Sequence, residues 1–133
     1  MKILVTPTSL QPGKKQPALQ RLQEFCPNLV FNDMGKPLSE EQLIPLLKDC
    51  DGYIAGLDFI TEKVLDACPN LKVISRYGAG YDRVDLEAAK RNHITVTNTP
   101  GSNAQAVGKL TFGLILNAAR KIPSLDSQLR SSQ

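Results

Sequence analysis

The stretch from residue 71 to residue 82 reads Leu71-Lys72-Val73-Ile74-Ser75-Arg76-Tyr77-Gly78-Ala79-Gly80-Tyr81-Asp82. Its first half includes the apolar residues Leu71, Val73 and Ile74, two of them β-branched, which is typical of a strand, and the strand runs into a pair of glycines. A dinucleotide-binding turn has the fuller pattern G-x-G-x-x-G, with an acidic residue about 20 positions further on. Arg83 stands where the third glycine would be, and Asn98 where the acid would be. The stretch therefore indicates a strand and a glycine turn without the dinucleotide pattern.

The glycine turn can still hold an anion. Glycines let successive backbone N–H groups converge on one point, and a carboxylate could bind there beside Arg76. The alternative is purely structural, with Gly78 and Gly80 turning the chain at the end of the strand and doing nothing more. Spacing alone leaves both interpretations open.

Strands and helices alternate along the chain on both sides of this stretch. Short β-rich runs are predicted at residues 3–6, 29–32, 52–55, 72–76 and 94–98. Helical stretches lie between them, and three have helix-starting residues: Ser39 with Gln42 in a capping-box pattern, Thr61, and Asp85. Pro45 lies inside the second helical stretch and leaves its start or its axis open. Because a parallel return needs a crossover, this alternation predicts βαβ units and one parallel sheet.

The last helical stretch is unusually apolar. Ser102 and Gln105 form another capping-box pattern, and the helix is predicted to run to about Lys121. Its apolar residues lie on most sides of the helix: Val107, Leu110, Phe112, Leu114, Ile115, Leu116, Ala118 and Ala119. One sheet cannot cover such a helix, so a second subunit or a second domain is expected to pack on it. After Pro123, residues 124–133 are polar and patternless, and we expect a frayed linker there.

The composition is that of one globular domain. The chain has 133 residues, of which 41% are apolar and 22% charged, and its net charge is +3 with acids and bases interspersed. Nucleic-acid binding would need a clustered basic surface and stacking aromatics, whereas aromatic residues make up only 5%. No apolar run approaches the roughly 20 residues of a membrane span. We therefore expect a soluble protein with no nucleic-acid partner and no membrane insertion.

The cysteines and the histidine do not form a recognisable chemical site. Cys26, Cys50 and Cys68 lack metal-binding spacing, and no secretory signal precedes the first strand. They are expected to be reduced thiols in a cytoplasmic protein that binds no metal. His93, the only histidine, lies in a predicted turn between a helix and a strand and is expected to face solvent. A complete acid–base site is not visible in the sequence.

Two longer runs carry a resemblance to a known family. They read Ile74-Ser75-Arg76-Tyr77-Gly78-Ala79-Gly80-Tyr81-Asp82-Arg83-Val84-Asp85-Leu86-Glu87-Ala88-Ala89 and Ile94-Thr95-Val96-Thr97-Asn98-Thr99-Pro100-Gly101. Residues 51–56 and 69–74 fit the same pattern. These runs resemble the D-isomer-specific 2-hydroxyacid dehydrogenases, and within that family most of all the D-3-phosphoglycerate dehydrogenases. The resemblance extends from about residue 49 to residue 123, while the first third of the chain agrees only as a βα pattern.

The resemblance implies an α/β fold: a flavodoxin-like three-layer sandwich with a parallel five-stranded sheet, ending in a long apolar helix. Residues 1–123 would form the substrate-binding (catalytic) domain, and residues 124–133 a tail or linker. The family's Rossmann NAD-binding domain would be absent from this chain, together with the catalytic arginine, glutamate and histidine. The helix at residues 103–121 would lie at the domain junction and contribute to a homodimer.

The resemblance also implies roles for single residues. Substrate binding would fall to Arg76, Tyr77, Gly78, Ala79, Gly80 and Asn103, with the substrate carboxylate on the backbone amides of the glycine loop. Ala79 and Val107 match positions that border the nicotinamide of NAD. Gly108-Lys109 replaces the Ala-Glu of many relatives, and Gly56 stands where some phosphoglycerate-specific relatives carry an arginine.

The full-length enzyme would oxidise a D-2-hydroxyacid such as 3-phosphoglycerate to the 2-oxoacid and pass the hydride to NAD. This chain alone is expected to be inactive, because it lacks both the cofactor pattern and the catalytic residues. The alternative is a stand-alone binding or regulatory module that senses a carboxylate metabolite or pairs with a full-length paralogue, as Lys109 and the polar tail after Pro123 would suit. A third possibility is a flavodoxin-like binder of phosphate or flavin.

Overall fold

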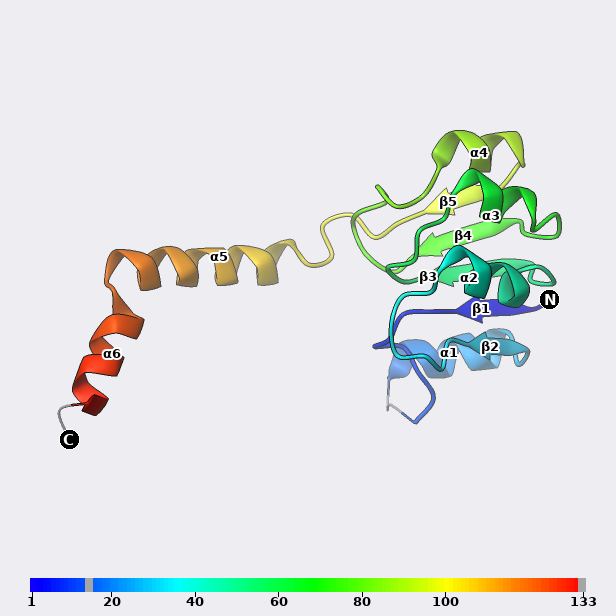
Figure 1. Cartoon of the computed structure of the whole chain (residues 1–133). Helices are drawn as coiled ribbons and strands as arrows, with labels where there is room; N and C mark the ends of the chain where they lie inside the picture. The colour runs from blue at the N-terminus through cyan, green and yellow to red at the C-terminus, as the bar shows by residue number, and fades with distance from the viewer. Residues whose placement is uncertain (14–15, 132–133) are drawn as a thin grey trace. The chain divides into compact units, whose positions relative to one another are not determined.

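The computed structural model describes residues 1–13 and 16–131. The chain divides into two compact units, Met1–Pro100 and Gly101–Gln133, and each is described by itself. Among the described residues, the first unit holds the sheet with four helices, and the second holds two helices (Figure 1). The domain boundary expected at residue 123 stays a prediction.

The first unit is built on one parallel sheet. Its strands are β1 Ile3–Val5, β2 Leu29–Phe31, β3 Gly52–Ala55, β4 Val73–Arg76 and β5 Thr95–Thr97. They lie in the order β2-β1-β3-β4-β5, and every neighbouring pair is parallel. This is the strand order of flavodoxin-like doubly wound sheets, in which the direction of winding reverses between β1 and β3. The predicted α/β class and parallel five-stranded sheet are confirmed, and each strand falls within its predicted range.

Helices pack on both faces of this sheet. They are α1 Pro17–Phe25, α2 Glu40–Leu47, α3 Glu62–Asp66 and α4 Leu86–Arg91 (Figure 1). Alternate side chains of β1 belong to different cores, because successive residues of a strand point to opposite faces. Ile3 and Val5 share one buried cluster with Leu19 of α1, while Leu4 belongs to the larger cluster formed with α2, α3 and α4. The three-layer sandwich implied by the resemblance is therefore confirmed.

The helix starts predicted for the first unit are confirmed. The Ser39 N–H donates to Gln42 Oε1 (3.1 Å) at the start of α2, and Asp85 Oδ1 accepts the Ala88 N–H (2.9 Å) at the start of α4. Pro45 lies inside α2 without ending it, and the helix continues to Leu47. After α4, His93 adopts a left-handed φ of 56° and is exposed, as expected of a turn residue.

The second unit corrects two expectations. Its first helix, α5 Ala104–Ala119, begins after Asn103 as N-cap, so the capping box predicted at Ser102 is wrong. The frayed tail expected after Pro123 is also wrong, because α6 Ile122–Ser131 is helical and follows α5 in the chain. Proline is tolerated in the first turn of a helix, where its missing N–H has no intrahelical partner. Residues 132–133 of the predicted tail lie outside the described residues.

The apolar surface predicted for the long helix is present on α5. None of its residues is buried, and its large apolar side chains are each about half exposed or more: Val107, Leu110, Phe112, Leu114, Ile115 and Leu116. A further apolar stripe on α6 is equally exposed and consists of Ile122, Leu125 and Leu129. No helix in the described part of the chain is both long and apolar enough to cross a membrane.

The three cysteines are buried, and none forms a disulfide. Burial raises the pKa of the Cys68 thiol to about 11, with a smaller contribution from Cys50. We expect the folded chain to resist iodoacetamide at about pH 8 and all three thiols to react after unfolding. The pKa of Cys68 in the folded chain lies above the value of about 8.5 for an unfolded cysteine. The buried thiol therefore contributes to the free energy of unfolding below about pH 8.5, and this contribution is lost as the pH rises toward 11. Mass spectrometry that detects rapid alkylation of the folded protein would contradict the prediction.

Candidate functional site

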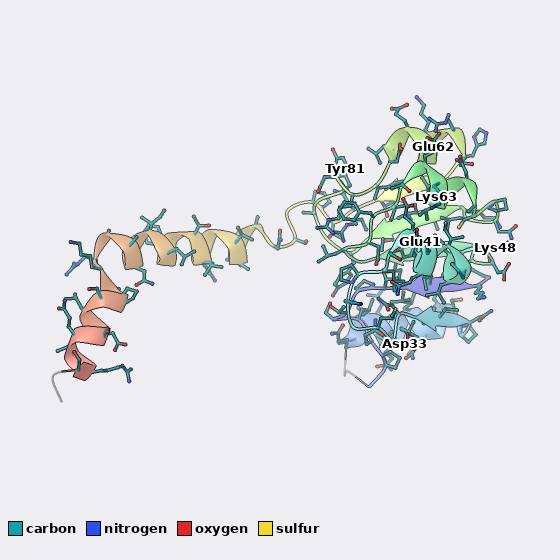
Figure 2. All side chains as sticks on the ribbon, viewed as in Figure 1. Asp33, Glu41, Lys48, Glu62, Lys63 and Tyr81 are labelled. Atoms are coloured by element: carbon teal, nitrogen blue, oxygen red, sulfur yellow. The ribbon has the colours of Figure 1, made fainter. Side chains whose placement is uncertain are left out.

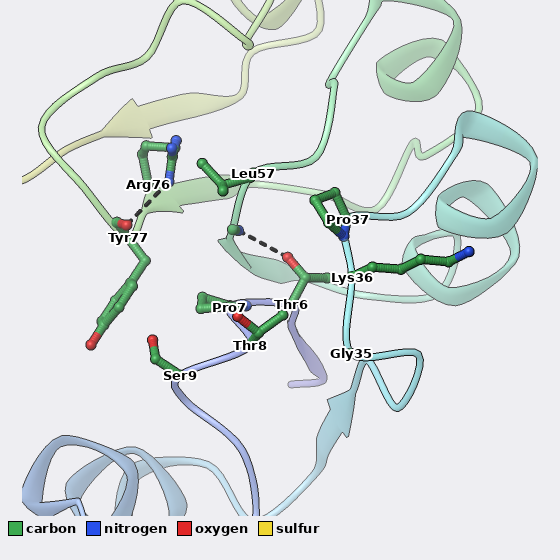
Figure 3. Close-up of a pocket in the computed structure, with 11 residues that line it drawn as sticks. Thr6, Pro7, Thr8, Ser9, Gly35, Lys36, Pro37, Leu57, Arg76 and Tyr77 are labelled. Carbon is green, nitrogen blue, oxygen red and sulfur yellow. Dashed lines mark hydrogen bonds between the residues drawn. The ribbon is translucent and has the colours of Figure 1, made fainter. Parts of the chain in front are cut away.

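A cavity lies at the carboxyl edge of the sheet, where β1 to β4 end (Figure 3). We call it the strand-end cavity. Its volume is about 400 Å³, and it is lined by Thr6, Pro7, Thr8, Ser9, Gly35, Lys36, Pro37, Gly56, Leu57, Arg76 and Tyr77. It includes the edge between β1 and β3, where winding reverses and the loops after the two strands diverge. In open α/β sheets, ligands bind at this switch point outside the carboxyl ends of the strands.

Arg76 is the buried cation of this cavity. It is the last residue of β4, and only 8% of it is exposed. Its Nη1 donates to the carbonyl oxygens of Ala55 (3.2 Å) and Tyr77 (3.1 Å), and the second of these bonds is drawn in Figure 3. Its Nε is buried and has no hydrogen-bond partner among the described residues. A buried donor of this kind calls for an acceptor, so the position favours an anionic ligand.

The charges around the cavity favour an anion as well. Lys36 is the second cation of the lining, and the described lining residues include no carboxylate. Neither Arg76 nor Lys36 has an ion-pair partner in the described ranges. On the outer surface, by contrast, charges neutralise each other: Glu41 Oε1 of α2 lies 3.7 Å from Lys63 Nζ of α3 (Figure 2). The cavity therefore carries net positive charge.

The predicted glycine loop follows Arg76 directly. Two of the four backbone N–H groups at residues 77–80 already donate to carbonyl oxygens of the protein. The Tyr77 N–H donates to the Ala55 oxygen (2.9 Å), and the Gly78 N–H donates to the Arg76 oxygen (2.9 Å). These two amides are satisfied by the protein's own carbonyls, so Gly78 offers no N–H to a ligand. The N–H groups of Ala79 and Gly80 have no hydrogen-bond partner in the part of the chain that the structure describes.

The loop is fixed from its other side by the residues after β5. The Asn98 side-chain amide donates to the Ala79 oxygen (2.7 Å), and the Thr99 N–H donates to the Gly78 oxygen (3.1 Å). Ala79 is half-buried and Gly80 is exposed. The loop thus has two adjacent N–H groups without a partner among the described residues, on a backbone held by hydrogen bonds.

The structure brings five of the predicted site residues together and leaves two in the other unit. Arg76, Tyr77, Gly78, Ala79 and Gly80 form one continuous segment of the first unit. Asn103 and Val107 belong to the second unit, at the N-cap and in the first turn of α5, and both are exposed. Their approach to the glycine loop stays a prediction.

Most of the cavity lining lies outside the residues predicted from the sequence. Residues 6–9, 35–37 and Leu57 carry no motif of their own. The available signal was their position, because each of these segments follows a predicted strand and the ends of parallel strands meet at one edge of a sheet. Among the described residues, no group of three or more His, Cys, Asp or Glu side chains could hold a metal ion.

Comparisons with known proteins agree with this geometry. The profile of the family described as "D-isomer specific 2-hydroxyacid dehydrogenase, catalytic domain" matches residues 3–125. A glyoxylate reductase of Thermofilum pendens is 40% identical over 119 residues, which cover 89% of this chain and 35% of that protein. A D-3-phosphoglycerate dehydrogenase of Sus scrofa is 42% identical over 97 residues, which cover 72% of this chain and 18% of that protein.

Solved structures show the same relationship. A 3-phosphoglycerate dehydrogenase of Entamoeba histolytica with bound NAD⁺ has a TM-score of 0.72 and 34% identity, over 88% of this chain and 38% of that one. A phosphoglycerate oxidoreductase of Vibrio cholerae has a TM-score of 0.69 and 30% identity, over 98% and 41%. This chain therefore spans well under half the length of these relatives. Since the family profile covers nearly all of it, the chain belongs to the D-isomer specific 2-hydroxyacid dehydrogenases and matches the profile of their catalytic domain.

Proposed function

We propose that this chain is the substrate-binding part of an NAD-dependent D-2-hydroxyacid dehydrogenase whose substrate resembles 3-phosphoglycerate. The observation that carries the proposal is the pair of N–H groups on Ala79 and Gly80, which have no partner among the described residues and lie three and four positions after the buried Arg76. The names of the relatives, which include phosphoglycerate dehydrogenases and glyoxylate reductases, support the same substrate class.

The site would divide the substrate between two positions. The carboxylate would accept hydrogen bonds from the Ala79 and Gly80 amides, each charge-assisted bond contributing roughly 1.5–3 kcal/mol. The distal phosphate would enter the strand-end cavity, where Lys36 and Arg76 supply positive charge. This arrangement leaves the hydroxyl-bearing carbon between the two anionic ends. An open site on one unit encloses its ligand incompletely, so the affinity of this chain alone would be millimolar or weaker.

The described residues do not fit NAD. A pyrophosphate-binding turn needs a helix N-terminus directly after its glycines. Here α4 begins only at Leu86, and the Gly78 N–H is occupied by the Arg76 oxygen. Hydride transfer needs a bound nicotinamide and a general acid or base, so we propose that this chain alone has no dehydrogenase activity. Ala79 and Val107 would border a nicotinamide held by another part of a longer protein.

A second copy of the chain is the proposed partner of the apolar surface on α5. The surface is contiguous along one helix and exposes large apolar side chains that would be costly to leave in water. A homodimer through residues 103–121 would cover it. We place the protein in the cytoplasm, because its three cysteines are unpaired thiols.

A titration with 3-phosphoglycerate, followed by two-dimensional amide NMR on this chain, tests the proposed substrate. We expect the amide signals of Ala79 and Gly80 to move, with a dissociation constant in the millimolar range or weaker. D-glycerate, which lacks the phosphate, should move the same signals at higher concentration. Shifts confined to other parts of the chain would overturn the proposed site, and NAD-dependent turnover by this chain would overturn the proposed inactivity.

One observation favours a second candidate, a stand-alone module that binds a carboxylate metabolite. The strand-end cavity and the two unpartnered amides all belong to Met1–Pro100. All the groups of the proposed anion site thus lie within the first unit. Micromolar binding of 3-phosphoglycerate by this chain would favour the module over part of a larger enzyme, because a site shared with another domain should bind weakly when incomplete.

A further inference from the structure

Asp58 is a buried carboxylate that none of the proposed substrate contacts uses. It follows β3 in the chain, and only 2% of it is exposed. In the described ranges, no lysine, arginine or histidine forms an ion pair with it. Burying a charge without a counter-ion is unfavourable unless its hydrogen bonds are satisfied, so the partners of this carboxylate show what holds it there.

Three donors converge on the Asp58 carboxylate. Its Oδ1 accepts the Leu38 N–H (2.7 Å), and its Oδ2 accepts the Tyr53 hydroxyl (2.7 Å) and the Thr6 hydroxyl. Burial raises the pKa of Tyr53 well above its ordinary value, and the charge of Asp58 raises it further, so the phenol stays a proton donor. The Thr6 Oγ1 in turn accepts the Gly56 N–H (2.9 Å), a bond that Figure 3 shows beside the cavity.

These contacts end on three separate walls of the strand-end cavity. Thr6 begins the wall of residues 6–9, which follows β1. Leu38 comes directly after the wall of residues 35–37, which follows β2. Gly56 begins the wall after β3 and is reached through Thr6. Three loops that are distant in the sequence are therefore joined by one side chain.

We propose that Asp58 is a positioning residue that holds these three walls in the arrangement required for anion binding in the strand-end cavity. The binding part of this inference rests on the proposed function, whereas the mechanical part rests on the hydrogen bonds alone. A carboxylate suits the task because its two oxygens can accept several hydrogen bonds at once, which no apolar side chain could do. The strand-end cavity would then be preorganised, and its ligand would not have to order the loops.

Amide hydrogen exchange on three variants tests the mechanical part. Asp58→Asn keeps the side-chain shape and leaves Thr6 in place as the acceptor of Gly56. Thr6→Val leaves Asp58 in place as the acceptor of Leu38, and serves if the first variant fails to fold. Tyr53→Phe is the matched control, because it removes one donor to the same carboxylate from within β3, together with the 3.2 Å contact of that hydroxyl with Thr6 Oγ1, and leaves the Leu38 and Gly56 N–H bonds in place.

We expect exchange at Gly56 in Asp58→Asn, and at Leu38 in Thr6→Val, to accelerate about tenfold beyond the change in global stability. In Tyr53→Phe, exchange at both amides should follow global stability alone. Equal acceleration in the control, or none in the first two variants, overturns the inference.

The affinity for 3-phosphoglycerate then separates the two proposals. Asp58→Asn should weaken binding about tenfold, while Tyr53→Phe should leave it within about twofold of the original chain. If the original chain binds no 3-phosphoglycerate, the proposed substrate fails while the exchange data still decide whether Asp58 holds the walls. If the original chain binds and Asp58→Asn binds equally well, the positioning role fails while the proposed function stands.

Discussion

Replacement of Ile74 by alanine will lower the free energy of unfolding of the first unit by about 2–5 kcal/mol, the range for large-to-small changes in a packed core. Ile74 is fully buried in β4, where it pairs with Tyr53 of β3 and Val96 of β5. Its side chain belongs to the larger core cluster, shared by α2, α3 and α4. Deleting its outer carbons leaves a cavity that the surrounding strands cannot fill, because strands fixed on both sides have little freedom to move inward.

The control for this prediction is the residue before it. Val73 lies in the same strand but points to the opposite face, and 38% of it is exposed. Val73→Ala should cost less than about 1 kcal/mol, since it removes little buried surface. Urea unfolding followed by tyrosine fluorescence measures both variants, because the chain has no tryptophan. Equal losses in the two variants would contradict the difference in burial between Ile74 and Val73.

The alternation of strands and helices could be predicted because each element repeats a simple local pattern. Val73 and Ile74 are apolar and β-branched, and glycines follow at residues 78 and 80, which marks both the strand and its end. The helix at Ile122–Ser131 was not predicted because residues 124–133 are mostly polar, although a proline in the first turn of a helix is favourable. The spacing of Ile122, Leu125 and Leu129 is the helical signal that was present in the sequence.

The candidate site was predictable only where it coincides with a motif. The segment from Arg76 to Gly80 stood out by its glycines, but the sequence could not show that the Gly78 N–H is taken up by the Arg76 oxygen. Hydrogen bonds of this kind depend on backbone dihedral angles, which glycine leaves unrestricted. Thr6, Lys36 and Asp58 were missed because the order of the strands, rather than any local pattern, brings them to one edge of the sheet.

Replacement of Arg76 by methionine will weaken the binding of 3-phosphoglycerate by about tenfold to a hundredfold, the equivalent of one charge-assisted hydrogen bond. Methionine preserves much of the apolar stem but removes the buried positive charge and the unpartnered Nε. Of the described lining residues, Lys36 alone would then supply a cation. Arg76→Lys should lose less affinity, because it retains the charge while giving up the planar arrangement of donors.

The matched control is Arg83→Met, which removes an arginine from the same end of the unit. The Arg83 guanidinium lies over the Phe59 ring, 4.6 Å from its centre, and donates to the Leu57 oxygen, but it does not line the cavity. Its loss should change the affinity by no more than about twofold, since its guanidinium is partly open to solvent and its charge is screened by salt. Amide NMR titrations with 3-phosphoglycerate measure all three variants, and urea unfolding verifies that each is folded. If Arg76→Met and Arg83→Met lose affinity equally, the ligand responds to the net charge of the surface and not to the buried guanidinium, and the proposed anion site is wrong.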